Sequence, residues 1–210
     1  MCCRFYLELS PELRPYIEAA NRSPLMKVMT EKLSKPMIAG GEVRPSDIAA
    51  VLAPDKTGKP ASFPMMWGFS LPGRRDSLFN ARIETAMLKP SFRESWAKRR
   101  CAVPASYYFE WEHLPSLSPG RAKTGDKYRI HPKGSRLIFL AGLNRMEEKG
   151  GIMLPVFTVL TMDSSVSVRS IHDRMPVILP ENQVREWVIP SGDPDQIMKS
   201  ALTDMTVSKC

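Results

Sequence analysis

The nineteen prolines of this 210-residue chain set the firmest limit on how it can fold. Proline removes a backbone donor and interrupts both helices and central strands, so long elements and a helix bundle are disfavoured. Several strands with fewer helices predict an α+β fold, with a curved, barrel-like and mostly antiparallel sheet flanked by short helices. Apolar or aromatic runs of strand length occur at Cys101–Trp111, Lys127–Ile130, Leu137–Leu143, Val156–Thr161 and Pro176–Leu179.

The predicted helices are short and lie between these strands. Ser10 is a suitable N-cap for a helix that runs to Ala20, and Arg44–Leu52 is expected to be a loop followed by a short helix. Further helices are expected at Pro90–Arg100 and Glu181–Val188, and a mobile loop at His113–Asp126. We expect a single domain over residues 1–210, with a core at about 2–190 and a C-terminal tail at 191–210.

Charge and hydropathy narrow the classes of partner. The formal net charge of +8 favours a polyanionic partner without specifying one. The longest apolar runs, Leu137–Leu143 and Met153–Leu160, are far shorter than the roughly 20 residues that a membrane helix requires. With no secretory signal at the N-terminus, we expect no membrane association and a cytoplasmic protein, associated with the nucleoid in a bacterium or located in the nucleus of a eukaryote.

The cysteines do not have the spacing of a metal site. Cys2, Cys3, Cys101 and Cys210 form no CxxC pair, and the chain contains three histidines. A structural zinc site is therefore not expected, and the sequence predicts neither a metal nor a cofactor. In a reducing compartment the four cysteines are thiols.

Two polar segments lie among apolar residues. The segment from Phe79 to Thr85 can be explained by structure alone, as a turn in which Arg82 forms an ion pair with Glu84. In the aromatic segment that ends at Trp111, Glu110 shares one strand face with Tyr108. Desolvation there would raise the pKa of this carboxyl toward the range useful for proton transfer, whereas an edge strand would leave it in water.

A histidine and a tryptophan are further candidates. His172, between an isoleucine and an aspartate just before an apolar strand, suits a proton-transfer site, although a lone histidine is more often structural. Trp67 beside Gly68 could stack on a base or fill the core, and the core reading is favoured by the sequence alone.

The chain begins MCCRF, with two cysteines directly after the initiator methionine. Termini tolerate change, so chance is one explanation. The alternative is chemical: removal of Met1 leaves Cys2 with a free α-amine and a thiol on neighbouring carbons.

These motifs, taken in order, resemble the SRAP family of abasic-site processing proteins. The resemblance runs from Met1 to about Val188 and is dense in NARIETA, KPSFRESWAKRRCAVPA, the FEW of YYFEW and IHDRMPVIL. It implies an SRAP-like fold whose concave face takes single-stranded DNA or a single-strand/duplex junction, and a protein that acts as a monomer.

The resemblance also implies a role for each matching residue. Cys2 corresponds to the nucleophile, Glu110 to the acid/base group, Asn80 to a residue that holds the linked sugar, and His172 to one that stabilises the opened sugar and transfers protons. The residues expected to bind DNA are the phosphate contacts Arg4, Arg82 and Arg174, the stacking or wall residues Trp67 and Trp111, and Thr161. Arg99 and Arg100 are expected to form a solvated helix end.

The implied reaction uses both groups of Cys2. The ring-opened abasic sugar is an aldehyde, with which the α-amine forms a Schiff base, and the thiol then closes a thiazolidine. The implied activity is thus a covalent DNA–protein crosslink in response to DNA damage, with crosslink reversal and an autoprocessing peptidase activity as further expectations. One departure is Cys3, where the family has glycine; its effect on the approach of Cys2 is left open.

Two other function classes remain open from the residues. One is a cysteine peptidase or amidohydrolase of the N-terminal-nucleophile type, which also requires removal of Met1 but acts on an amide. The other is a non-catalytic module that binds single strands through its basic face and tryptophans. A heat-resistant adduct with abasic DNA is expected of a crosslinking protein, and of neither of these two alternatives.

Overall fold

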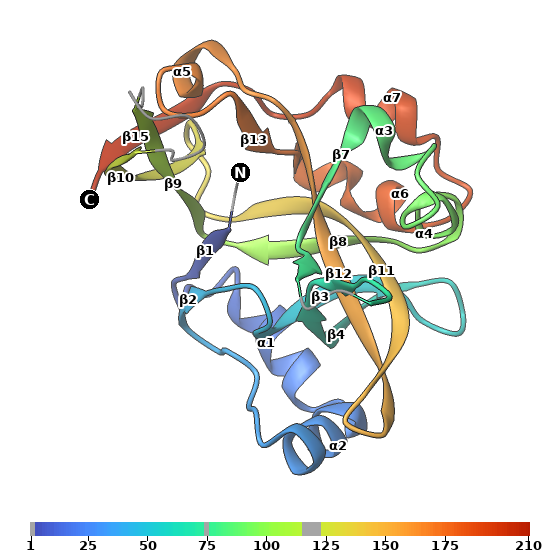
Figure 1. The fold of residues 1–210 in the computed structure, drawn as a ribbon. Coiled ribbons are helices and arrows are strands. Elements are labelled where there is room, and N and C mark those ends of the chain that lie inside the picture. The colour runs from blue at the N-terminus through green and yellow to red at the C-terminus, as the bar shows by residue number, and fades with distance from the viewer. Residues whose placement is uncertain (1–2, 74–75, 115–122) are drawn as a thin grey trace.

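A closed five-stranded barrel forms the centre of the computed structural model, which describes residues 3–73, 76–114 and 123–210 (Figure 1). Strand β12 pairs antiparallel with β11 and parallel with β4, which closes the ring β12-β4-β3-β8-β11. Three of its strands, β3, β8 and most of β12, are almost continuously buried, so their sequences alternate little between apolar and polar residues. The barrel strands are β3 (Ile48–Pro54), β4 (Pro60–Trp67), β8 (Arg100–Ala105), β11 (Ile138–Lys149) and β12 (Ile152–Asp163).

A second, antiparallel sheet of five strands extends from the barrel, in the order β15-β10-β9-β1-β2. One chain segment links the two sheets, because β8 continues into β9 after a single residue, Ser106. The backbone N–H of Ser106 donates to the carbonyl of Tyr6 at 2.9 Å, and its hydroxyl accepts from the backbone of Glu8 at 2.8 Å. The strands of this sheet are β1 (Arg4–Leu7), β2 (Gly41–Val43), β9 (Tyr107–Leu114), β10 (Lys123–Pro132) and β15 (Met205–Lys209).

Short elements complete the fold. Figure 1 shows α1 and α2 at one end of the barrel and α3, α4, α6 and α7 gathered at the other. The helices are α1 (Arg14–Asn21), α2 (Pro24–Leu33), α3 (Ile83–Ala86), α4 (Arg93–Lys98), α5 (Val166–Arg169), α6 (Val184–Val188), which follows the 3-10 turn η1 (Glu181–Gln183), and α7 (Pro194–Lys199). The remaining strands are β5 (Phe69–Ser70), β6 (Ser77–Leu78), β7 (Asn80–Arg82), β13 (Arg174–Pro176) and β14 (Ile178–Leu179).

The predicted α+β class and the mostly antiparallel, barrel-like sheet are confirmed. The prediction of a short helix within Arg44–Leu52 is wrong, because this segment leads into β3, whose side chains lie in the barrel wall. The expected loop is shorter than His113–Asp126, because its two ends belong to β9 and β10, which pair there; residues 115–122 lie outside the described residues. Residues 191–210 are no simple tail, since they supply α7 and β15, and β15 pairs with β10.

The N-terminal end of β8 is tied to the helical end of the molecule by Arg100. This side chain was expected at a solvated helix end, but it is 3% exposed. Its guanidinium donates to the carbonyls of Trp187 and Ile189, both at 2.7 Å, and of Gly192 at 2.8 Å. The five fixed donors of arginine suit several carbonyls at once, so Arg100 is a structural anchor. Arg99, in contrast, is exposed as expected. No helix in the described part of the chain is long and apolar enough to cross a bilayer.

Candidate active site

Glu110 lies buried in the middle of the second sheet. Strand β9 runs between β10 and β1, and the register places Glu110 opposite Tyr128 and Phe109 opposite Arg4. The Glu110 side chain is on the same face as Tyr108, as strand alternation predicts, and the residue is only 3% exposed. Burial raises the pKa of this carboxyl above its ordinary value. The alternative of a solvated edge-strand glutamate is therefore excluded.

A pocket of about 280 Å³ opens beside Glu110. Cys3, the first residue that the structure describes, lies half-buried in its wall. Burial, and then the negative charge of Glu110, raise the pKa of the Cys3 thiol, so it is held in the protonated form. The pocket is lined by Cys3, Arg4, Glu110, Trp111, His113 and Thr124. The predicted nucleophile Cys2 lies outside the described residues.

Positive charge surrounds Trp111 at the edge of this pocket. The Arg4 guanidinium lies 5.0 Å from the centre of the Trp111 ring, and the Lys127 ammonium 5.2 Å from it. Both cations bind the carboxylate of Glu42, Arg4 at 2.5 Å and Lys127 at 2.9 Å, and Arg44 binds it as well. Burial alone would raise the pKa of Glu42, but hydrogen bonds from these three cations lower it to about 2. Three cations around one carboxylate leave a net positive edge.

His172 is buried close to this pocket, in the segment between α5 and β13. Its ring centre is 4.0 Å from that of His113, one of the pocket residues. The Nδ1 atom accepts a hydrogen bond from the backbone N–H of Arg174 at 2.9 Å and lies 2.7 Å from a carboxylate oxygen of Asp173. Burial is the main cause that lowers the pKa of His172 to about 4. The imidazole is therefore neutral at neutral pH.

Asn80 and Arg82 lie on β7, away from the lining of this pocket. Strand β7 runs parallel to β12 and pairs Asn80 with Val159 and Arg82 with Thr161. Asn80 is half-buried, while the side chain of Arg82 is exposed at the surface. The expected ion pair of Arg82 with Glu84 is replaced by a pair between Glu84 and Arg174.

Three residues expected to contact DNA are buried in the protein. Trp67 is fully buried: its ring stacks 5.9 Å from that of Phe157, and its indole N–H donates to the Phe79 carbonyl, so it fills the core. Thr161 is also fully buried, on β12. Arg174 is 6% exposed and its guanidinium binds carboxylates within the protein. These three assignments are corrected, because buried side chains cannot reach a DNA strand at the surface.

His113 is the site residue that the sequence reasoning missed. It was placed at the start of a predicted loop, but it continues β9 and lines the Glu110 pocket. The signal was present in the strand alternation, which extends beyond Trp111. Within the described ranges, no group of three or more His, Cys, Asp or Glu side chains could hold a metal ion.

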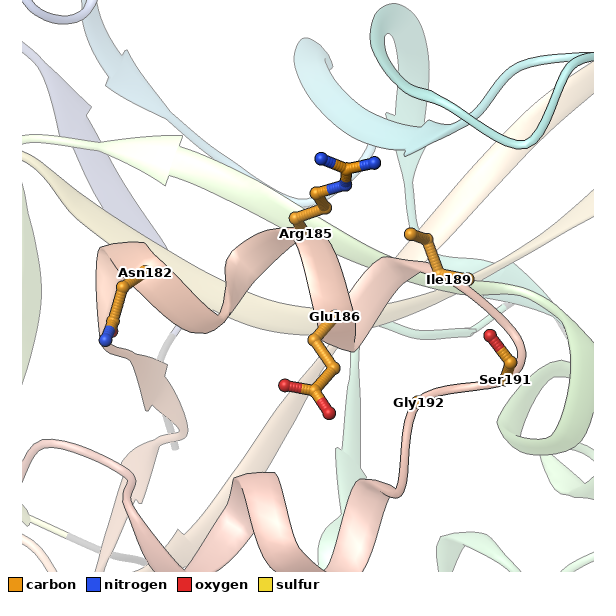
Figure 2. Close-up of a pocket in the computed structure, with 6 residues that line it drawn as sticks. All are labelled: Asn182, Arg185, Glu186, Ile189, Ser191 and Gly192. Carbon is orange, nitrogen blue, oxygen red and sulfur yellow. The ribbon is translucent and has the colours of Figure 1, made fainter.

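A second pocket of about 280 Å³ lies at the helical end of the barrel (Figure 2). None of the predicted site residues lines it. It is formed by α6 and the turn that Arg100 anchors from below, with Asn182, Arg185, Glu186, Ile189, Ser191 and Gly192 around it. In Figure 2 the charged groups of Arg185 and Glu186 point to different sides of the helix, so they do not converge on one ligand position.

Known structures share this fold. A protein of Bacteroides thetaiotaomicron superposes with a TM-score of 0.71 at 20% identity, covering 99% of this chain and 91% of that one. A phage-related protein of Bordetella bronchiseptica gives a TM-score of 0.70 at 22% identity, with 100% and 94% covered. Both likenesses concern the fold alone.

Curated relatives carry closer sequence similarity. The abasic site processing protein YobE of Bacillus subtilis is 36% identical over 145 residues, which are 66% of this chain and 64% of that protein. The abasic site processing protein YedK of Escherichia coli is 31% identical over 130 residues, or 60% and 54%. The matched region spans about three fifths of the length of the curated relatives from Bacillus subtilis. The model of one family, "SOS response associated peptidase (SRAP)", matches residues 1–209, and the chain therefore belongs to the SRAP family.

Proposed function

We propose that this protein processes abasic sites by linking Cys2 covalently to the opened sugar in single-stranded DNA, after Met1 has been removed. The observation that carries the proposal is the buried Glu110, which shares a pocket with Cys3, the residue after the proposed nucleophile. Membership of the SRAP family and the names of the relatives support the same activity.

The chemistry balances without a cofactor. The amine of Cys2 adds to the sugar aldehyde to give a carbinolamine, which loses water to form an imine. The thiol then adds to the imine carbon, and its proton passes to the nitrogen, so that one water is the only product besides the thiazolidine. Each step moves a proton, and burial, which raises the pKa of the Glu110 carboxyl, makes this group better suited to donate a proton as well as to accept one. The same groups would serve the reverse reaction.

The surface beside the pocket suits a DNA backbone. Arg4, Arg44 and Lys127 place positive charge next to Trp111, where phosphates flanking the lesion would lie. Trp111 is partly exposed and can stack on a neighbouring base. Arg82, which is exposed on β7, remains a proposed phosphate contact.

Cys3 does not compete as a nucleophile, for two physical reasons. Its α-nitrogen is an amide, so it cannot form the thiazolidine. Burial beside Glu110 keeps its thiol protonated, and a thiol attacks carbon far more slowly than a thiolate.

The adjacent cysteines provide a matched pair of variants. Protein with Met1 removed is incubated with an oligonucleotide that carries one abasic site, and adducts are separated under heat and denaturant. We expect Cys2→Ala to abolish the adduct while most non-covalent binding remains, and Cys3→Gly to retain it. An undiminished adduct with Cys2→Ala would place the nucleophile elsewhere.

The peptidase in the family description suggests a second activity of the same N-terminal group. An N-terminal thiol can attack an amide carbonyl as well as an aldehyde. Peptide cleavage that requires Cys2, without any DNA adduct, would favour this function. Binding to single strands with neither product would favour a non-catalytic module.

A further inference from the structure

Two histidines from distant parts of the sequence meet beside the candidate site. His113 is the residue before Leu114, where β9 ends, and His172 follows α5. Their ring centres are 4.0 Å apart, with the planes inclined at 50°. His172 is only 4% exposed, whereas His113 is exposed and lines the Glu110 pocket. One ring therefore faces the interior, and the other faces both the pocket and solvent.

Hydrogen bonds of the backbone hold this pair together. The N–H of His113 donates to the carbonyl of Ile171 at 2.9 Å, which fastens β9 to the segment that carries His172. The N–H of His172 donates to Val168 at 3.1 Å, and its Nδ1 accepts from the N–H of Arg174 at 2.9 Å. The fold thus holds the two backbone segments together, and the hydrogen bond from Arg174 orients the His172 ring.

Charged groups from several elements lie around the pair. Glu110 on β9 and Arg4 on β1 line the same pocket as His113. Asp173 contacts the His172 ring, and Arg174, the first residue of β13, acts on it through its charge. Two imidazoles this close repel each other when both are protonated, and His113 is one of the causes that keep His172 neutral. The positive charge of one ring therefore disfavours a second charge on the other.

A buried neutral imidazole cannot readily exchange protons with solvent. Carbinolamine formation, imine formation and ring closure each require acid/base groups that give up protons and take them up. His172 has almost no contact with water through which to exchange them. An exposed imidazole in contact with His172 could exchange protons with water on its behalf. Histidine is the side chain best suited to proton transfer near neutral pH.

We propose that His113 is a proton-relay residue, which passes protons between solvent and the His172–Glu110 site during crosslink formation and reversal. The proposal rests on the proposed function and adds to it a residue of this chain. No proton is gained or lost overall: the amine gives up the two protons that leave in the water molecule, and the thiol proton passes to the nitrogen.

Two variants and a matched control test the relay. His113→Gln retains the backbone bond to Ile171, and His113→Ala leaves room for a small molecule. His131, which lines a different pocket, serves as the control in His131→Gln. Adduct formation is measured under single-turnover conditions from pH 5.5 to 9, with and without added imidazole, together with binding to an oligonucleotide without a lesion.

We expect both His113 variants to form the adduct about tenfold more slowly at neutral pH, since a positioned acid/base group contributes ~10²–10⁴-fold and water replaces part of a relay. Their rate should lose its dependence on pH near neutrality, and imidazole should restore His113→Ala. Binding should stay unchanged, and His131→Gln should match the parent.

Parental rates and an unchanged pH profile in both variants would overturn the relay, and so would a slow His113→Ala that imidazole does not restore, because that result indicates a structural role. These outcomes are distinct from failure of the proposed function, in which the parent protein itself forms no adduct; that result would overturn both.

Discussion

Arg174 binds Glu84 through two parallel hydrogen bonds, of 2.7 and 2.8 Å, and this pair ties the segment of His172 to helix α3. The same guanidinium donates to Asp163 at 2.5 Å and to the carbonyl of Thr161 at 2.7 Å. Because the backbone of Arg174 also donates to His172, the network fixes the position of a candidate catalytic group. The sequence suggested a phosphate contact, but the burial of Arg174 assigns it to the architecture.

Arg174 and Arg82 should therefore differ in their effects. Arg174→Gln removes the donor of the buried Thr161 carbonyl and the cation that Glu84 and Asp163 share, and should lower the free energy of unfolding by about 2 kcal/mol. Arg82→Gln, at an exposed position, should change it by less than ~0.5 kcal/mol but reduce the salt dependence of DNA binding. Urea denaturation and binding at several salt concentrations measure the two effects. Equal stability of both variants would contradict the structural role of Arg174.

The pH dependence of stability should report the burial of His172. The pKa of its imidazole is about 4 in the folded protein and 6.5 ordinarily, so the unfolded chain binds more protons between these values. Stability is therefore fully present above pH 6.5 and falls as pH decreases toward 4, by up to about 3 kcal/mol from this group. His172→Gln should flatten the profile in this window, as followed by urea denaturation. A slope identical to that of the parent would show that the imidazole is not buried in its neutral form.

The contribution of Glu110 to stability should depend on pH in the opposite direction. Its folded pKa lies above the ordinary carboxyl value of 4.5, so its contribution to stability is complete below that value and is lost as pH rises through the folded pKa. Glu110→Gln, which cannot ionise, should gain stability relative to the parent between pH 4 and pH 8, while it forms the DNA adduct more slowly. Paired denaturation curves at the two pH values test the first effect. A variant that loses stability relative to the parent as pH rises would contradict the burial of an ionisable carboxyl.

Arg100 offers a test of the helical end of the barrel. Arg100→Lys keeps the charge but cannot reach the carbonyls of Trp187, Ile189 and Gly192 together, so buried acceptors lose their donors. We expect a loss of about 2 kcal/mol, against almost none for the exposed neighbour Arg99→Lys. Thermal and urea denaturation measure this difference. Similar values for the two variants would contradict the anchoring role.

Local sequence patterns predicted the sheet and the buried position of Glu110, and the reason is physical. Strand alternation is a property of the backbone, so the side of β9 on which Glu110 lies follows from counting residues. The desolvated environment of Glu110 followed from its aromatic neighbours. The fold class could be read from the number of prolines and the short apolar runs.

Long-range contacts explain the errors. Whether Arg174 faces DNA or Glu84 depends on a residue 90 positions away. Arg100 is buried because the turn after α6 folds over it, which no local pattern indicates. The segment that forms β3 has alanines suited to a helix, and only the neighbouring barrel strands make it a strand. The core position of Trp67 was the reading that its own sequence favoured, and the family resemblance led away from it.

The central claim, that the α-amine and thiol of Cys2 act together, is tested most directly by the mass of the DNA-linked peptide. In a variant with one alanine inserted between Met1 and Cys2, Met1 can still be removed, but the nitrogen of Cys2 becomes an amide. The parent should give an N-terminal peptide whose mass and stability to heat match a thiazolidine with the sugar. The insertion variant should lose this product while its binding to DNA is unchanged. A heat-stable adduct of the insertion variant, linked through sulfur at either cysteine, would contradict the account.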